Sequence, residues 1–156
     1  DYSNALNTIE SNMNELIYDY KELERNKHEE PEEDYKANLK SLKENIRFLT
    51  FYKLGLNIFI QADSFKRSAL PTDQEYAASL MNLLVLPPVH NEVRKIFYMA
   101  ALRENLKFRN YKVALKLLKS FHKQITDLTE EEKLDIEEIK KECEQNLDKG
   151  VEMFTC

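Results

Sequence analysis

The placement of proline and glycine constrains this chain more than any other feature of its sequence. The 156 residues include only two glycines and four prolines. Proline interrupts helices and glycine weakens them, so their scarcity leaves long segments free to become helical. All four prolines fall between segments in which apolar residues recur every three or four positions: Pro31, Pro71, Pro87 and Pro88. We therefore predict an all-α fold.

Apolar periodicity divides the chain into six predicted helices. They span residues 3–25, 33–65, 72–86, 92–108, 111–124 and 130–148. Thr72 precedes Glu75 by three residues, and Thr129 precedes Glu132 by the same step, which is the spacing of a capping box. Each threonine is therefore predicted to cap a helix. Asn91 is predicted to cap the fourth helix. The sixth helix is predicted to close at the second glycine, "KG", after residue 148.

Four of these helices have a predicted inner face, and in the second it is formed by Tyr35, Leu39, Leu42, Ile46, Leu49 and Tyr52. In the first it is formed by Leu6, Ile9, Met13, Leu16, Ile17, Tyr20 and Leu23. In the fourth it is marked by Ile96, Phe97, Ala100 and Leu106, and in the fifth by Val113, Ala114, Leu117, Leu118 and Phe121. Residues at three- and four-residue steps share one side of a helix, so these faces are expected to build the core.

Length and composition predict a single helical domain over residues 1–156. Hydrophobic residues make up 42% of the chain and charged residues 33%, as in long helices with two different faces. The stretch 26–34, "NKHEEPEED", is acidic and broken by Pro31, so it is predicted to be an exposed loop. From Phe48 onward the second helix is apolar almost all round. That end is expected to lie in the core, with Gly55 at a close approach between helices.

One pattern occurs twice, in "DYSNALNTI" at residues 1–9 and in "RNYKVALKLL" at residues 109–118. The matching triplets are Tyr2, Ala5 and Ile9, and Tyr111, Ala114 and Leu118. An aromatic over a turn, a small residue at a close approach and a large apolar residue are typical of the second helix of a tetratricopeptide unit. Any amphipathic helix hairpin could also show this pattern. The copies lie much farther apart than one repeat of about 34 residues. We therefore predict an irregular, tetratricopeptide-like α-solenoid of about six helices. Because the chain starts within the pattern and without Met, it is expected to be a piece of a longer polypeptide.

Charge is distributed unevenly along the chain. Residues 94–123 contain nine basic residues and only one acidic residue, Glu104, whereas residues 127–148 contain three basic and ten acidic residues. Two interpretations remain open. The basic stretch could contact phosphates of RNA or of an anionic membrane, or the acidic sixth helix could pack beside it and neutralise it. The net charge of −5 argues against nucleic acid as the main partner.

The sequence contains no recognisable catalytic constellation. Two glycines cannot supply a phosphate-binding loop, and the three histidines, His28, His90 and His122, are far apart in the sequence. The two cysteines, Cys143 and Cys156, are expected to be reduced thiols of a cytosolic protein, although Lys140 and Lys141 could lower the pKa of the first. We therefore predict a non-enzyme with no catalytic residues, no cofactor and no metal site.

Several segments together resemble one known family. They are "FYKLGLNIF", "KRSALPTDQEYAASLMNLLVLPPVH", "FRNYKVALKLLKSF" and "IKKECEQN", in this order. Their order and spacing are similar to the carboxy-terminal domain of coatomer alpha subunits, with most of the specificity in "LPPVH" (86–90) and "FRNYKVA" (108–114). The chain departs from the family in three places. Residues 90–110 are about one helical turn longer, the acidic loop is unusual, and the family's Cys-containing tail is missing after "EMFTC".

The resemblance implies a scaffold domain of the COPI vesicle coat that binds the coatomer epsilon subunit, itself a tetratricopeptide protein. It implies a cytoplasmic protein, peripheral on Golgi and COPI vesicle membranes, that supports Golgi-to-ER and intra-Golgi transport. A helical adaptor of another complex is the alternative. Aromatic side chains of the first two helices are the candidate partner-binding residues: Tyr18, Tyr20, Tyr35, Phe51, Tyr52, Phe59 and Phe65. Core packing is the alternative role for each of them. Structural roles are expected for Pro87, Val89, His90, Tyr111, Ala114 and Leu118.

Overall fold

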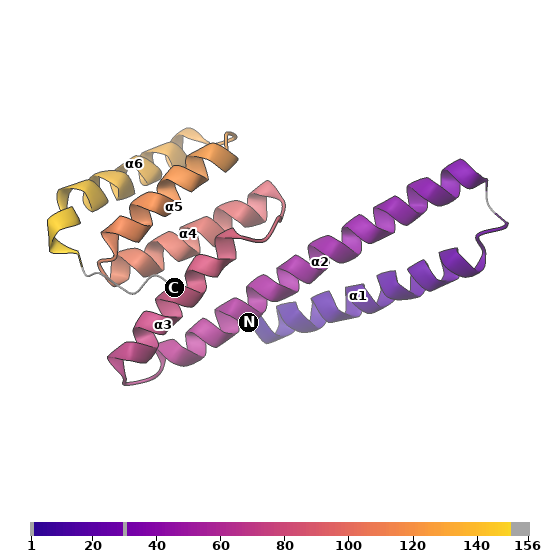
Figure 1. Ribbon diagram of the computed structural model, residues 1–156, viewed down its shortest axis with the longest axis horizontal. Helices are drawn as coiled ribbons and strands as arrows, with labels where there is room; N and C mark the ends of the chain where they lie inside the picture. Colours follow the sequence, from indigo (N-terminus) through magenta and orange to yellow (C-terminus); the bar gives the residue numbers. More distant parts are fainter. Residues whose placement is uncertain (1, 30, 151–156) are drawn as a thin grey trace. The chain divides into compact units, whose positions relative to one another are not determined.

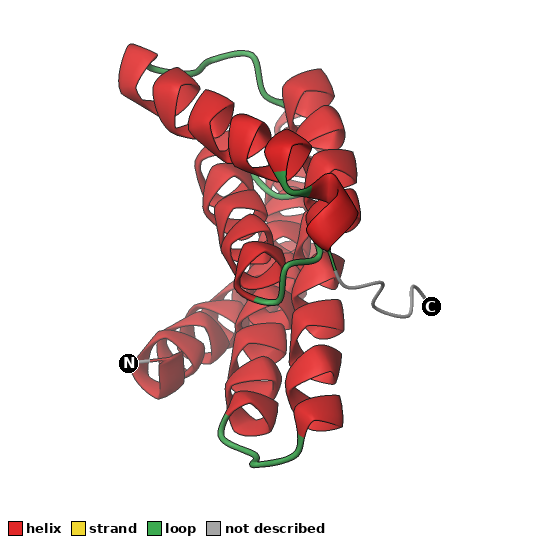
Figure 2. Ribbon diagram, turned by 90° about the vertical axis from the view of Figure 1, so that its left-hand side faces the viewer, coloured by secondary structure: helices red, strands yellow, loops and turns green. Residues whose placement is uncertain are grey.

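The computed structural model describes residues 2–29 and 31–150, and these residues are all-α (Figures 1 and 2). They form helices α1 (Tyr2–Arg25), α2 (Glu32–Lys66), α3 (Pro71–Met81), α4 (Asn91–Lys107), α5 (Tyr111–Gln124) and α6 (Glu130–Gln145). Two 3₁₀ turns, η1 (Asn82–Val85) and η2 (Leu147–Lys149), follow α3 and α6. No strand occurs in the described ranges. The predicted all-α fold and the six predicted helices are confirmed.

The chain divides into two compact units, residues 1–60 and 61–156, where the sequence predicts one domain. Unit 1 holds α1 and most of α2, and unit 2 holds the end of α2 and everything that follows. The helices of each unit pack in a different way. Unit 1 is a hairpin of two long helices. Unit 2 consists of shorter helices that pack together around a hydrophobic core.

Unit 1 is held together by one stripe of apolar side chains along each helix. The predicted face of α1 is half-buried, but no described residue of α1 is fully buried, and Ile17 is exposed. Ring contacts and ion pairs reinforce the hairpin. Tyr2 stacks on Phe59 with ring centroids 5.5 Å apart, and Lys53 lies 2.8 Å from Glu10. A two-helix hairpin offers only one packing surface per helix, so its side chains retain partial exposure.

Unit 2 has a continuous core contributed by α4, α5 and α6. Its buried residues are Tyr98, Ala101, Leu102, Tyr111, Ala114, Leu117, Leu118, Phe121, Ile125, Ile136 and Cys143. The predicted inner face of α5 is confirmed except that Val113 is only partly buried. For α4 the prediction was wrong at Ile96, which is 61% exposed. The buried face of α4 instead contains Tyr98, Leu102 and the polar Asn105. A search for apolar residues could not predict the burial of Asn105.

The two predicted capping boxes have different outcomes. Thr129 caps α6 as predicted, because its side chain accepts from the Glu132 backbone N–H while the Glu132 carboxylate accepts from the Thr129 N–H. Thr72 does not cap α3. The helix begins one residue earlier, at Pro71, because proline already has the backbone φ of a first helical position. The N-cap is therefore Leu70, and its side chain makes no capping hydrogen bond.

Other helix boundaries also differ from the sequence prediction. The N-cap of α4 is His90 rather than Asn91, and its side chain makes no capping hydrogen bond. The predicted third helix ends at Met81 and continues as the 3₁₀ turn η1, since the two prolines that follow leave no room for a further α-helical turn. The sixth helix ends at Gln145. Gly150 closes the short turn η2 with φ −72°, which is not the left-handed conformation of a glycine helix cap.

Candidate functional site

The turn between α4 and α5 is the most specifically built part of unit 2. Arg109 has φ 55°, a left-handed conformation that costs a non-glycine residue some energy. Gly150 packs against this turn. A Cβ at Gly150 would lie 3.0 Å from the Arg109 carbonyl oxygen and 3.2 Å from the Tyr111 ring. A side chain here would be in tight contact with the turn, so close approach favours glycine at this position, a reason different from the predicted helix cap.

Three asparagines connect this turn to η1. The Asn105 side-chain amide donates to Asn82 Oδ1 at 2.5 Å and to the Ala101 carbonyl at 2.8 Å. Asn110 Nδ2 donates to Asn105 Oδ1 at 3.0 Å. Asn105 is fully buried, so these partners replace the water that its amide loses on folding. Sequence reasoning missed this network, although an asparagine at the buried step of a helix and another in the "RN" turn were the available signals.

An ion pair links the last turn of α2 to α4 inside unit 2. Lys66 Nζ lies 2.7 Å from Glu104 Oε2, and the Glu104 side chain is only 10% exposed. Glu104 is the single acidic residue of the basic stretch. Its carboxylate pairs with Lys66, and its Oε1 also lies 3.9 Å from Lys107 Nζ. This residue therefore has a structural role that its position in the sequence did not indicate.

A small cavity of about 150 Å³ opens where α4, α5 and α6 meet. Its apolar wall includes Met99, Phe121 and Ile136, and its rim carries Lys95 and Glu132. The two rim residues form an ion pair at 3.3 Å. The backbone N–H of Thr129 and then Lys95 lower the pKa of the Glu132 carboxyl below its ordinary value. The lowered pKa favours the ionised Glu132 carboxylate on the rim, but no nucleophile lines the cavity.

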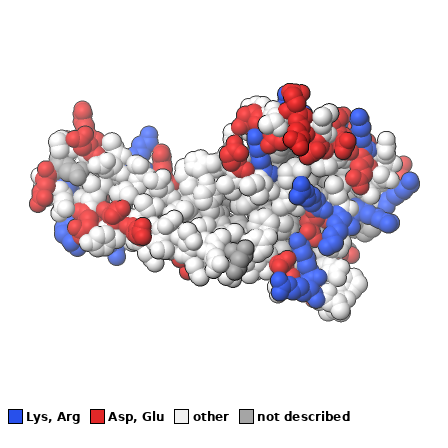
Figure 3. Space-filling view, turned by 180° about the vertical axis from the view of Figure 1, so that it is seen from behind, with Lys and Arg blue, Asp and Glu red and all other residues white. Residues whose placement is uncertain are grey.

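Charge neutralisation between α4 and α6 is real but incomplete. Lys95 meets Glu132 and also donates to the Asp127 carbonyl at 2.7 Å, as the neutralisation hypothesis expects. Viewed from behind, acidic side chains gather along the upper edge of unit 2, with lysine and arginine side chains below them (Figure 3). Three exposed lysines of α5 are not part of this pairing. Within the described ranges, Lys116, Lys119 and Lys123 make no ion pair.

The candidate partner-binding aromatics fall into different environments. Tyr18 is 63% exposed and available for contact. Tyr35 is buried, and its hydroxyl donates to Glu24 Oε1 at 2.7 Å, so its evident role is to hold α1 against α2. Phe65 meets Tyr76 edge to face, with centroids 4.9 Å apart. The others are half-buried along the two helices: Tyr20, Phe51, Tyr52 and Phe59. The structure does not gather these residues into one site.

The residues expected to have structural roles lie in two places. Pro87 and Val89 are buried between η1 and α4, and His90 is exposed at the α4 N-cap. Tyr111, Ala114 and Leu118 are buried on the inner face of α5. The two copies of the repeated pattern differ, because Ala5 is exposed whereas Ala114 is fully buried. Tyr2 is likewise exposed.

Cys143 does not have the surroundings of a reactive thiol. It is fully buried, and burial together with Glu142 and Glu144 raises the pKa of its thiol to about 11. The suggested lowering by nearby lysines was wrong, because burial dominates. Cys156 lies outside the described residues. Among the residues described, no group of three or more His, Cys, Asp or Glu side chains is placed to hold a metal ion.

Comparisons with models of protein families, with curated proteins and with solved structures found no match to the chain. None of the described helices is long and apolar enough to cross a membrane. The function must therefore be argued from the residues and the surfaces of the two units.

Proposed function

We propose that this chain is a non-enzymatic helical scaffold that binds another protein through its first helical hairpin. The observation that carries the proposal is the incomplete burial of α1, which runs for 24 residues with no buried residue among those described. A helix of this length usually covers one apolar face fully. Here Ile17 and Tyr18 remain exposed, and a partner could cover them.

The partner we propose is the coatomer epsilon subunit, and the setting is the cytoplasm, where the COPI coat is peripheral on Golgi and vesicle membranes. The support is the ordered resemblance of residues 51–59, 66–90, 108–121 and 139–146 to coatomer alpha subunits. A tetratricopeptide partner presents a helical groove, and an amphipathic helix with apolar residues at three- and four-residue steps suits such a groove. A stable interface needs roughly 1,600 Å² of buried surface, which a long hairpin can supply.

The test is a calorimetric titration of the chain with the coatomer epsilon subunit of the same organism at physiological salt. We expect a one-to-one complex of submicromolar affinity. The double variant Ile17→Asp/Tyr18→Asp should weaken binding at least tenfold, because it places two charges at the proposed contact. The matched control is Ser11→Asp/Asn12→Asp, which adds the same charge at exposed positions of α1 and should bind within about twofold of the unmodified chain.

Absence of binding with both proteins folded would reject the coatomer assignment. Binding that the Ile17/Tyr18 variant does not weaken would support the partner but reject the hairpin as its site. Binding to a different helical protein that responds to the same variant would favour the alternative, an adaptor of another complex.

A further inference from the structure

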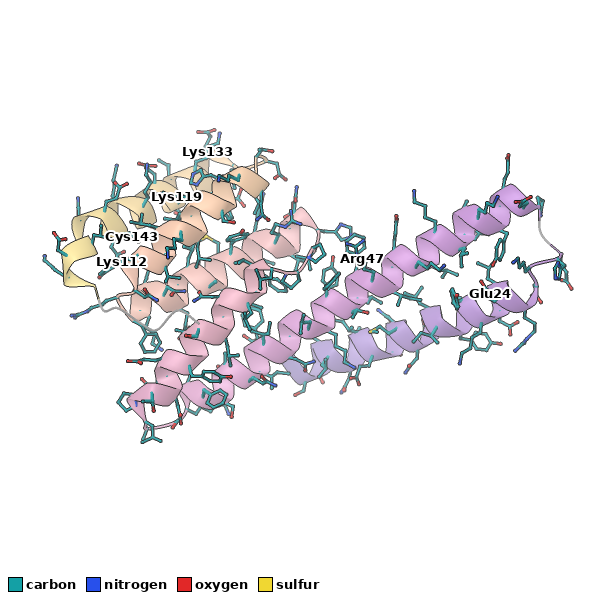
Figure 4. All side chains as sticks on the ribbon, viewed as in Figure 1. Glu24, Arg47, Lys112, Lys119, Lys133 and Cys143 are labelled. Atoms are coloured by element: carbon teal, nitrogen blue, oxygen red, sulfur yellow. The ribbon has the colours of Figure 1, made fainter. Side chains whose placement is uncertain are left out.

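One face of α5 carries a row of lysines. Lys112, Lys116, Lys119 and Lys123 follow one another at steps of four, three and four residues, so they share one side of the helix. All four are exposed, and the labelled Lys112 and Lys119 both lie along α5 (Figure 4). No acidic residue occurs between Glu104 and Asp127. The row is therefore a continuous positive surface without a neighbouring negative charge in the sequence.

The fold holds this row in place. The side of α5 opposite the lysines is buried, and it includes Ala114, Leu118 and Phe121. The Tyr98 and Ser120 hydroxyls are 2.7 Å apart, which links α4 to α5, and the Phe121 ring meets Tyr98 edge to face at 5.3 Å. Since α5 packs against both α4 and α6, its lysine face is the side left for solvent.

Three lysines of the row, Lys116, Lys119 and Lys123, have no acidic partner among the described residues. Three acidic residues of α6 pair with lysines outside the row: Glu130 with Lys133 at 2.6 Å, Glu132 with Lys95 at 3.3 Å and Glu137 with Lys140 at 3.6 Å. Lys116, Lys119 and Lys123 make no ion pair in the part of the chain that the structure describes. Three adjacent ammonium groups that repel one another would gain from an external polyanion.

The side chains on this face of α5 favour one class of binding partner over the others. Protein interfaces are poor in lysine and rely on aromatic or arginine anchors, and the aromatics of α5, Tyr111 and Phe121, are buried. Single-stranded nucleic acid is bound by exposed aromatics that stack on bases, and the row offers none. Lipid headgroups diffuse and can gather beneath flexible lysines, so a membrane requires no fixed matching geometry. We propose that the lysine face of α5 docks on an anionic phospholipid surface.

This inference does not depend on the proposed scaffold function, because it rests on a different unit and a different partner. The contact is peripheral and electrostatic, with no apolar side chain inserted. Each lysine near an anionic leaflet contributes roughly a fivefold gain in partitioning. Loss of three lysines should therefore reduce partitioning roughly a hundredfold, and high salt should have a similar effect because it screens exposed charges.

The test is sedimentation of the full chain with vesicles of phosphatidylcholine, with and without phosphatidylserine. We expect binding only to vesicles containing phosphatidylserine, and its loss in K116Q/K119Q/K123Q. The matched control is K36Q/K40Q/K43Q, which removes three exposed lysines from α2, one of which, Lys36, pairs with Glu32. Circular dichroism establishes that both variants keep their helices, as expected for exposed positions.

Three results would overturn the proposal. The chain could bind both kinds of vesicle equally or neither, or the α2 variant could lose as much binding as the α5 variant. The same lysines could instead govern binding to a duplex RNA or DNA oligonucleotide under conditions where vesicles do not bind, which would assign the row to nucleic acid. Since epsilon-subunit binding is measured separately, either proposal can fail without the other.

Discussion

Asn105 connects three parts of unit 2 through one side chain. Its replacement by Leu keeps the approximate size but leaves the Asn110 amide and the Asn82 carbonyl oxygen without their partner. Buried polar groups left unsatisfied are costly, so we expect Asn105→Leu to lower the free energy of unfolding by about 2–4 kcal/mol. Chemical denaturation measures this loss. Asn14→Leu, at an exposed position of α1, should change stability by less than about 0.5 kcal/mol.

The hydrogen bond between Tyr35 and Glu24 makes unit 1 sensitive to alkaline pH. The hydrogen bond that the Tyr35 hydroxyl donates to Glu24 is the largest cause of a raised pKa at Tyr35, followed by burial and the charge of the Glu24 carboxylate. Together they raise this pKa from 10.0 to about 12. The folded state therefore favours the protonated phenol. Its contribution to stability is complete below pH 10 and is lost as pH rises through about 12.

Tyr35→Phe tests this linkage, because phenylalanine keeps the ring and has no proton to lose. We expect the stability of the unmodified chain to fall relative to that of the Phe variant between pH 10 and pH 12. Denaturation at a series of pH values measures the difference, and phenolate absorbance follows ionisation. A constant difference across this range would contradict the role given to the Glu24 contact.

At the scale of the element, the start of α6 depends on Thr129 and the start of α3 does not depend on Thr72. Thr129→Ala removes a real capping hydrogen bond and should lower the free energy of unfolding by about 1 kcal/mol. Thr72→Ala is the matched control, because Thr72 is an exposed residue inside the first turn of α3 and should cost little. Equal losses in the two variants would mean that the capping box contributes nothing specific.

The helices could be predicted from the sequence because their signals are local. Periodic apolar residues, prolines between segments and the Thr129–Glu132 spacing act within a few residues of chain. The errors have tertiary causes. Ile96 belongs to the apolar pattern of α4 but faces solvent, since the helix turns Asn105 and Glu104 toward the other elements of unit 2. Pro71 overrode the capping signal of Thr72 because its ring has the required φ already.

At the scale of the whole molecule, the two units should differ in local stability. In unit 2, each of the helices α3, α4, α5 and α6 has buried residues. In α1, none of the described residues is buried. Helices with little buried surface open more readily. We expect backbone amides of residues 3–25 to exchange hydrogen for deuterium well before those of residues 98–121. Mass spectrometry of peptic fragments measures this order, and the reverse order would contradict the assignment of the main core to unit 2.

A binding partner should change this order. If the epsilon subunit covers the hairpin, α1 should gain protection in the complex while α5 keeps its own. Sequence reasoning could identify the helices and the aromatic residues that are candidates for such an interface. It could not separate buried Tyr35 from exposed Tyr18, because both lie on amphipathic helices and only the pairing of α1 with α2 decides their exposure. The lysines of α5 could be seen in the sequence, but only the structure shows that Lys116, Lys119 and Lys123 form no ion pair among the described residues.

The asparagine network also bears on how this chain can change over evolutionary time. An exposed lysine of α5 can be exchanged alone, because each contributes independently to the charge of that surface. The buried Asn110 amide donates to the buried Asn105 carbonyl oxygen, so a substitution at either position leaves a polar group of the other without its partner. Related chains should therefore replace both asparagines together or keep both, and mutational drift at this turn should proceed in pairs.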